Sequence, residues 1–293
     1  MPSAAARFYP RFACREGPRA AYSHRRAVSA LIAMAETPFS IPARLVDELR
    51  VAKHVVALTG AGISAESGVP TFRAAQTGLW ARYDPLELAT PEAFRRQPRV
   101  VWEWYAWRRE LVARASPNPG HLALVEMERR VPRWTLITQN VDGLHQRAGS
   151  RAVIELHGNI RRIKCSREGE VVESWEETGE VPPQCPRCGA PLRPDVVWFG
   201  EALPCQALTE AFVAAGACDL FLSIGTSGLV EPAASLPYEA LRRGAVVVEV
   251  NPEETPLTAR ATYALRGPAG RVLPALVRAA WGIDLPSFSD NFT

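Results

Sequence analysis

The sequence predicts an α/β fold in which a doubly wound parallel sheet carries helices on both faces. Short apolar runs that end in turn residues recur along the chain, at 55–58, 134–137, 220–224 and 246–250. Segments with helical periodicity lie between these runs, as at 119–131 and 232–243. Strands that are apolar throughout and alternate with helices are typical of a parallel sheet buried on both sides. We therefore expect a Rossmann-like core.

The first apolar run breaks at Gly60 into a loop of small residues that suits a bound dinucleotide. Gly60 and Gly62 permit a sharp turn and a close approach of the backbone to a pyrophosphate, and exposed amide groups there favour negative charge. However, Ala65 stands where the usual fingerprint has its third glycine. A bare Gly-x-Gly is more often only a strand-to-helix turn, so other features must support a dinucleotide site.

Two stretches interrupt the alternation of strands and helices. Residues 161–193 contain three of the six cysteines, glycine-bearing turns and alternating residues around 171–175, which predicts a small antiparallel metal ribbon. Residues 72–117 are rich in Trp, Arg and Pro and predict a helical insertion. A helix over 98–115 has one apolar stripe at 100° per residue, with Arg108 in its middle. The stripe consists of Val101, Trp104, Tyr105, Leu111, Val112 and Ala115.

The composition excludes several classes of protein. With 293 residues, 47% of them hydrophobic and 22% charged, the chain can bury a full core. We expect no membrane crossing, because no apolar run approaches the roughly 18 residues of a spanning helix. The net charge of +3 is local, since residues 1–36 carry six arginines against two glutamates (+4) and the remainder carries −1. A near-neutral body with a basic arm does not indicate a nucleic-acid-binding domain.

The basic extension, residues 1–36, has two interpretations. It fits a mitochondrial presequence, and it equally fits an upstream extension of the reading frame with initiation at Met34. We favour the second, because Lys53 and Lys164 are the only lysines and such arginine usage is typical of a GC-rich genome. The expected location is therefore a prokaryotic cytoplasm, with mitochondria as the alternative.

Five short segments in a fixed order resemble the sirtuin family of NAD-dependent protein deacylases. The segments are 55–73, Thr138–His145, Glu155–Gly158, Gly225–Ser227 and Val248–Pro252. The resemblance runs from about Pro42 to Leu276 and implies a catalytic domain over 37–287, followed by a tail over 288–293. It implies NAD as the cofactor and acylated-lysine proteins or peptides as partners. A monomer or weak oligomer with no nucleic acid is expected.

His157 is the predicted catalytic base. It follows a short apolar stretch, and an imidazole with a pKa near 6.5 suits general base catalysis at neutral pH. Without the resemblance, it is simply a polar residue at a turn. In the family's chemistry, the acyl-lysine oxygen attacks the ribose carbon that nicotinamide leaves, forming an alkylimidate. The resemblance implies that His157 then activates a ribose hydroxyl, giving free lysine and O-acyl-ADP-ribose.

The resemblance also implies a set of cofactor contacts. Asn140 and Asp142 orient the nicotinamide and its ribose and count as catalytic, although Asn-Val-Asp-Gly is equally typical of a turn. Phe72 covers the nicotinamide pocket and excludes water; alone, it would be ordinary core. The other implied contacts are Gly60, Ala61, Gly62, Ile63, Ser64, Arg73, Gln139, Val141, Gly225, Thr226, Ser227, Asn251, Pro252, Glu253 and Ala269.

Tyr105 and Arg108 resemble the pair that marks deacylases for acidic acyl groups. An arginine on an apolar face is usually a snorkelling or paired residue. Because Tyr105 stands one turn earlier on the same face, the phenol and the guanidinium can grip one carboxylate together. The prediction is removal of succinyl and malonyl groups, with glutaryl as a further candidate and with weaker deacetylation.

The resemblance also implies two segments that hold the substrate between them as an added strand. They are the stretch Val196, Val197, Trp198 and Phe199, and the stretch 228–231. Main-chain hydrogen bonds would then supply affinity with little sequence preference. Alternatively, 196–199 is a plain core strand.

The predicted metal ligands are Cys165, Cys185 and Cys188, with Glu168 as a candidate fourth. The family has two Cys-x-x-Cys knuckles, but the first here reads Cys165-Ser-Arg-Glu168. Oxygen is uncommon in closed structural sites, yet three thiolates already favour zinc. The sequence therefore does not decide whether zinc binds, although the three thiolates favour it.

Three other functions compete with deacylation. A mono-ADP-ribosyltransferase would share the cleavage of NAD, and a dehydrogenase would reduce NAD with a small-molecule substrate. A metal-ribbon module that recruits nucleic acid has only the cysteine knuckle and the basic arm in its favour, and neither explains His157.

Overall fold

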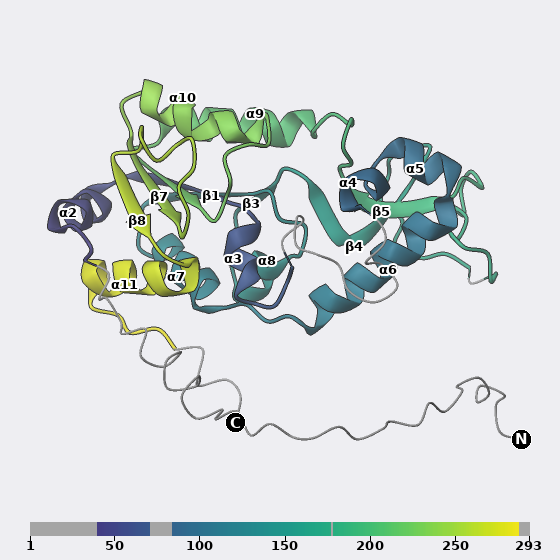
Figure 1. The fold of residues 1–293 in the computed structure, drawn as a ribbon, viewed down its shortest axis with the longest axis horizontal. Coiled ribbons are helices and arrows are strands. Elements are labelled where there is room, and N and C mark those ends of the chain that lie inside the picture. Colours follow the sequence, from purple (N-terminus) through teal and green to yellow (C-terminus); the bar gives the residue numbers. More distant parts are fainter. Residues whose placement is uncertain (1–39, 71–83, 177, 287–293) are drawn as a thin grey trace, which may run out of the picture. The chain divides into compact units, whose positions relative to one another are not determined.

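The computed structural model describes residues 40–70, 84–176 and 178–286, all within the unit 39–293. Its centre is a six-stranded sheet with the order β3-β2-β1-β6-β7-β8, in which every neighbouring pair is parallel (Figure 1). The strands are β1 (His54–Thr59), β2 (Arg133–Thr138), β3 (Val153–Glu155), β6 (Leu220–Ile224), β7 (Val246–Asn251) and β8 (Tyr263–Arg266). The predicted doubly wound parallel sheet is confirmed.

Helices cover the sheet on both faces (Figure 1). One layer holds α2 (Ala43–Val51), α7 (Pro119–Glu128) and α11 (Ala269–Trp281), and the other holds α9 (Cys205–Ala217) and α10 (Leu236–Arg242). In β1, Val55 and Ala57 pack toward the first layer and Val56 and Leu58 toward the second. All four are fully buried, which is why this strand has no polar alternation.

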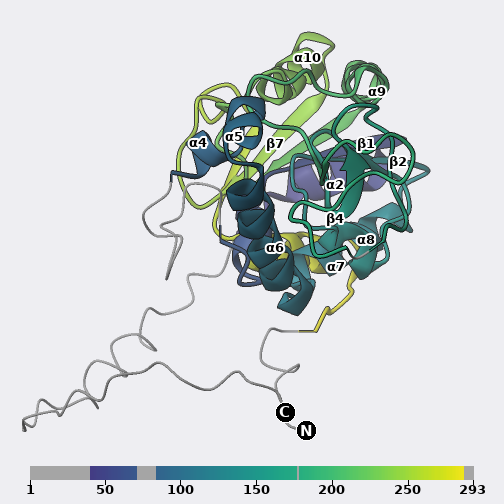
Figure 2. The ribbon, with the colours of Figure 1, turned by 90° about the vertical axis from the view of Figure 1, so that its right-hand side faces the viewer.

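A second, smaller part of the structure contains helices and an antiparallel ribbon (Figure 2). Its strands β4 (Gly158–Cys165) and β5 (Leu192–Val196) pair with an irregularity in register between Asn159 and Ile163. Its helices are α4 (Pro85–Leu88), α5 (Pro91–Arg96) and α6 (Pro98–Arg114). The helix predicted over 98–115 is therefore α6, which stops where Ala115 adopts an extended conformation.

The structure departs from the predicted elements at three points. The small residues after β1 form a short helix, α3 (Ala61–Ala65), in place of a loop. The segment 232–243 divides into a 3₁₀ turn, η2 (Ala233–Ser235), and α10. The alternation at 171–175 yields only one isolated bridge, between Lys164 and Val171.

One further short helix, α8 (Leu144–Ala148), follows the turn after β2. Within the described residues, no helix combines the length and the apolar character that a membrane span requires.

Candidate active site at the carboxyl edge of the sheet

The chain turns that follow β1 and β6 meet at the carboxyl edge of the sheet. These strands are neighbours although they are far apart in sequence. The strand order runs outward in one direction from β1 and in the other from β6, and doubly wound folds bind ligands at the point where this order reverses. An added Cβ on Gly62 would lie 2.7 Å from Gly225 Cα, and one on Gly60 would lie 2.8 Å from the Gly225 carbonyl oxygen. The glycines are therefore needed for the two backbones to meet.

The expectation of exposed amides at Gly60 and Gly62 is wrong. The Gly60 N–H donates to the Ile224 carbonyl at 3.0 Å, and the Gly62 N–H donates to the Gly225 carbonyl at 2.8 Å. Both donors are thus consumed by the contact between the two turns. The two glycines therefore shape the floor of the site and do not offer their own N–H groups to a ligand.

Ser64, Asn140 and Asp142 form one hydrogen-bonded group above this floor. The Ser64 hydroxyl donates to Asp142 Oδ2 at 2.7 Å, and Asn140 Nδ2 donates to Ser64 Oγ at 3.1 Å and to the Gly60 carbonyl at 3.0 Å. Asp142 Oδ1 also accepts the Leu144 N–H at 2.8 Å. Burial raises the pKa of Asp142, and the hydrogen bonds from Leu144 and Ser64 oppose that rise.

This network leaves one acceptor for a ligand. Both hydrogen bonds of the Asn140 side chain use its Nδ2, so within the described residues its Oδ1 has no partner. A free amide oxygen beside a buried carboxylate suits a ligand that offers N–H or O–H groups, such as a carboxamide or a ribose.

The His157 ring is held in one tautomer. It follows β3, and its Nδ1 lies 2.9 Å from the Gln139 carbonyl oxygen. Because a carbonyl only accepts, Nδ1 carries the proton and Nε2 presents a lone pair. Burial lowers the pKa of His157, and the bond to Gln139 opposes that shift. At neutral pH the ring is therefore uncharged, as a general base must be.

A second polar group lies at the ends of β6 and β7. Gln139 Nε2 donates to Thr226 Oγ1 at 3.0 Å, and Asn251 Nδ2 donates to the Thr226 carbonyl at 3.2 Å. Ser227 is exposed beside them, as are Pro252 and Glu253 in the loop that follows β7.

The remaining predicted cofactor residues differ in their surroundings. Ala269 is buried at the start of α11, where the Gly270 N–H donates to Glu66 Oε2 at 2.7 Å. Val141 is half-buried, and its carbonyl accepts the Ile160 N–H at 2.8 Å. Phe72 and Arg73 lie outside the described residues.

Tyr105 and Arg108 lie together on α6, as predicted. Tyr105 is 1% exposed, and the Arg108 guanidinium carbon lies 5.8 Å from the centre of its ring and 4.9 Å from that of Trp104. Burial raises the pKa of Tyr105, with a smaller opposing effect from Arg108. The phenol is therefore protonated at neutral pH and has a hydrogen that it can donate.

Val196 is the last residue of β5 and Trp198 lies beyond that strand, so 196–199 is not a strand throughout, but both side chains belong to the core and not to an exposed substrate-binding surface. Their side chains are 7% and 2% exposed. Their main chains are also occupied, since the Val196 carbonyl accepts from Arg193 at 2.9 Å and the Trp198 N–H donates to Glu201 at 2.8 Å. Phe199, in contrast, is 44% exposed.

Val197 ties this segment to the predicted base. Its side chain is half-buried, and its N–H donates to the His157 carbonyl at 2.9 Å. The segment after β5 therefore connects the backbone of His157 with the core that surrounds Tyr105.

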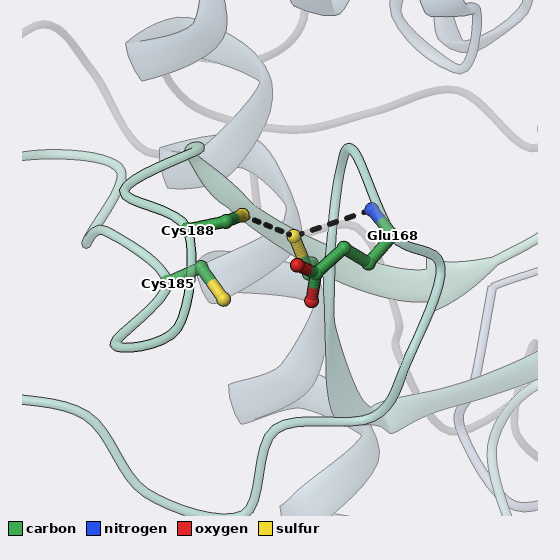
Figure 3. A group of neighbouring side chains, drawn as sticks. Glu168, Cys185 and Cys188 are labelled. Atoms are coloured by element: carbon green, nitrogen blue, oxygen red, sulfur yellow. Dashed lines mark hydrogen bonds between the residues drawn. The ribbon is translucent and has the colours of Figure 1, made fainter.

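The predicted metal ligands gather in the ribbon module. The ligand atoms of Cys165, Glu168, Cys185 and Cys188 all lie within 4.8 Å of one another. Figure 3 shows the Glu168 side chain reaching toward the cysteine sulfurs. Cys165 Sγ and Cys188 Sγ are 3.4 Å apart. Burial would raise the pKa of Cys185, but hydrogen bonds from backbone N–H groups and neighbouring thiols lower it to about 7.

Several residues that support the site were not predicted from the sequence. The Asn118 side chain caps α7 through Gly120, and its Nδ2 also donates to the Ile63 carbonyl at 2.6 Å. Buried Glu249 accepts from Thr255 and from Thr258, which anchors the loop after β7. Asn118 followed by Pro119 is a recognisable helix start, but its bond across 55 residues has no local signal.

Comparison with known proteins assigns the chain to a family. Residues 60–232 match the model of the Sir2 family. An NAD-dependent protein deacylase of Aquifex aeolicus is 58% identical over 208 residues, which cover 70% of this chain and 86% of the relative. A crystal structure of a Sir2 homologue in complex with NAD matches with a TM-score of 0.77 and 49% identity, covering 84% of this chain and 96% of the other.

A structure of Sir2 bound to an acetylated peptide also matches. Its TM-score is 0.71 at 34% identity, and the match covers 78% of this chain and 94% of the other. The chain belongs to the Sir2 family. Membership makes it an NAD-dependent enzyme of the protein deacylase type, and the predicted family is confirmed.

Proposed function

We propose that this enzyme removes acidic acyl groups from protein lysines, namely succinyl and malonyl groups, with glutaryl as a further candidate and acetyl as a poorer substrate. The observation that carries the proposal is the pairing of Tyr105 with Arg108 on α6. A protonated phenol can donate, and a guanidinium only donates. A carboxylate at the end of an acyl chain can accept from both, whereas a methyl group offers neither an acceptor nor a charge.

The side chains at the carboxyl edge of the sheet fit NAD. Asn140 and Asp142 would hold the nicotinamide end, and Thr226 and Asn251 would lie on the adenosine side. NAD supplies, when bound, an electrophilic ribose carbon that receives the acyl oxygen as nicotinamide leaves. The group formed by Ser64, Asn140 and Asp142 offers acceptors for the N–H groups of an amide and for the hydroxyl groups of a ribose.

His157 would serve as the base. Its Nδ1–H is held by the Gln139 carbonyl, so the lone pair on Nε2 can take a proton from a ribose hydroxyl. The products are nicotinamide, O-acyl-ADP-ribose and free lysine. Detection of the acyl ester on ADP-ribose would separate this reaction from mono-ADP-ribosyl transfer, in which the sugar remains on the protein.

The substrate backbone would pass between Phe199 and the segment 228–231. Phe199 and Leu229 are large apolar side chains that are 44% and 58% exposed. They can cover the aliphatic part of an acylated lysine, while main-chain groups of 228–231 pair with the peptide. The solved complex of a relative with an acetylated peptide supports a peptide as the substrate.

Replacement of Arg108 tests the acyl preference. Peptides that differ only in carrying succinyl, malonyl or acetyl lysine are incubated with NAD, and products are followed by mass spectrometry. Arg108→Met should lower kcat/KM for the succinyl peptide by roughly 100-fold or more, because the carboxylate loses its cation, while deacetylation stays measurable.

Arg109→Met is the matched control, since Arg109 is the next residue on α6 but stacks on Trp102, with 5.0 Å between its guanidinium carbon and the ring centre. This control should keep the ratio of the succinyl to the acetyl rate. Equal losses on both peptides in the Arg108 variant would contradict the proposal.

We also propose that the ribbon module binds zinc through three thiolates and Glu168. Tetrahedral zinc with bonds of about 2.3 Å places its sulfur ligands about 3.8 Å apart, close to the observed spacing. Arg187 pairs with Glu168 Oε2 at 2.8 Å and would orient the carboxylate. Metal analysis of protein purified without chelators should give one zinc per chain. A metal-free and well-folded protein would overturn this proposal.

A further inference from the structure

The Tyr105 hydroxyl has a buried partner that lies outside the site described so far. Trp198 Nε1 donates to the Tyr105 oxygen at 3.0 Å, and both residues are buried. An indole N–H can only donate, so the bond has one possible direction. Trp198 therefore occupies a lone pair of the phenol and leaves its hydrogen for another acceptor.

Two neighbours of Tyr105 among the described residues, Trp198 and Arg108, are donors. The nearby Arg108 guanidinium carries only N–H groups. Within the described residues, Trp198 is the one hydrogen-bond partner of the Tyr105 hydroxyl. The phenol hydrogen is thus left for a group that can accept it, and a carboxylate is such a group.

Trp198 is itself fixed from two sides. The Arg193 guanidinium carbon lies 3.3 Å from the centre of the indole ring. The backbone N–H of Trp198 donates to Glu201 Oε2 at 2.8 Å. Arg193 binds the same carboxylate through both Nη1 and Nη2, at 2.6 and 2.9 Å. Phe94 packs on the indole with ring centres 5.2 Å apart. The indole therefore has little freedom to turn away from Tyr105.

We propose that Trp198 is a positioning residue for acyl selectivity, which orients the Tyr105 hydroxyl so that its hydrogen meets the carboxylate of an acidic acyl group. The inference rests on the proposed function, because it assigns the Tyr105 and Arg108 pair to that carboxylate. Trp198 acts through Tyr105 and does not itself touch the substrate. Without the indole N–H, the phenol hydroxyl can rotate and form hydrogen bonds in other directions. Fixing its orientation when the substrate binds then costs conformational entropy.

Removal of the indole N–H tests the inference. In Trp198→Phe, the ratio of kcat/KM for the succinyl peptide to that for the acetyl peptide should fall by about 3- to 10-fold, as for the loss of one oriented hydrogen bond. The fall should appear in KM for the succinyl peptide. Because the ratio cancels any effect common to both substrates, a general loss of folding or catalysis does not mimic it.

A double-mutant cycle distinguishes positioning from packing. In the background Tyr105→Phe, which has no hydroxyl to orient, Trp198→Phe should leave the ratio unchanged. A ratio that is insensitive to Trp198→Phe in the native background would overturn the inference, as would an equal fall in both backgrounds.

An isosteric replacement guards against a variant that fails to fold. β-(3-Benzothienyl)alanine at position 198 exchanges the N–H for sulfur and keeps the ring against Arg193, and it should give the same 3- to 10-fold fall in the ratio. The activity of the native enzyme on the succinyl peptide distinguishes a failure of the proposed function from a failure of this inference. If it does not act on the succinyl peptide at all, the proposed function fails and this inference with it. If it does, and the ratio is insensitive to either replacement, only the role of Trp198 fails.

Discussion

Two histidines packed against each other near the candidate site predict a loss of stability as the pH falls. His121 and His145 are fully buried and their ring centres lie 4.9 Å apart. His145 Nε2 lies 2.9 Å from Thr59 Oγ1. Burial lowers the pKa of His145 from 6.5 to about 4. Burial, and to a smaller extent His145, lowers the pKa of His121 well below 6.5.

The sign and size of the effect follow from the difference between the folded and unfolded states. At neutral pH both rings are uncharged in either state, so the two histidines impose no proton-linked cost. As the pH falls below about 6.5, the unfolded chain takes up a proton at each ring first, and the free energy of unfolding decreases. For His145 alone the decrease is about 1.4 kcal/mol per pH unit, or about 3 kcal/mol by about pH 4.

Urea unfolding across about pH 4.5 to 7.5 measures this slope directly. His145→Gln retains an N–H for Thr59 and cannot take up a proton in this range. We expect the variant to be less stable at neutral pH but to lose stability less steeply below pH 6.5, by about 1 kcal/mol per pH unit. Equal slopes in the native protein and the variant would refute the reasoning. Equal m-values would confirm that the same transition is compared.

Three further predictions concern the turns, the base and the metal ligands. Gly62→Ala should lower stability by about 1–3 kcal/mol and abolish NAD binding in calorimetry, because its methyl group meets the Gly225 backbone. Gly216→Ala is the control and should have neither effect, because its methyl group meets only the flexible side chains of Glu239 and Arg243. As the pH is lowered, kcat/KM should begin to fall only below pH 6.5, because burial lowers the pKa of His157. His157→Gln should lower kcat/KM by about 100-fold or more. When a chelator is added, Glu168→Cys should retain zinc for longer than the native protein, and Glu168→Ala should retain it for less time. The reverse order would exclude Glu168 as a ligand.

Much of the fold could be predicted from local patterns. The run 55–58 is apolar at every position because both faces of β1 are buried, and that pattern alone indicates a covered parallel sheet. Helix α6 was also predictable, since its apolar stripe repeats with the helical period and Pro98 opens it. The edge strand β8 was missed because it is short and only partly buried.

The candidate site was predictable to a lesser degree. The motif residues after β1, β2, β6 and β7 fall at the same edge of the sheet, as parallel strands require, so their proximity follows from the sequence. The contacts that individual residues make could not be predicted from the sequence. Gly62 reads as a ligand contact in sequence but touches Gly225 in the fold, and Trp198 reads as part of a substrate strand but lies in the core.

The sequence by itself determined the class of fold, the order of its strands and helices, and the chemical groups available to the site. These properties depend on the periodicity of apolar residues and on short motifs, which are local. Only the tertiary structure decided the tautomer of His157, the partner of the Tyr105 hydroxyl and the burial of the His121 and His145 pair. Each of these depends on the direction of one hydrogen bond or on the exclusion of water, between residues brought together from separate elements of the fold.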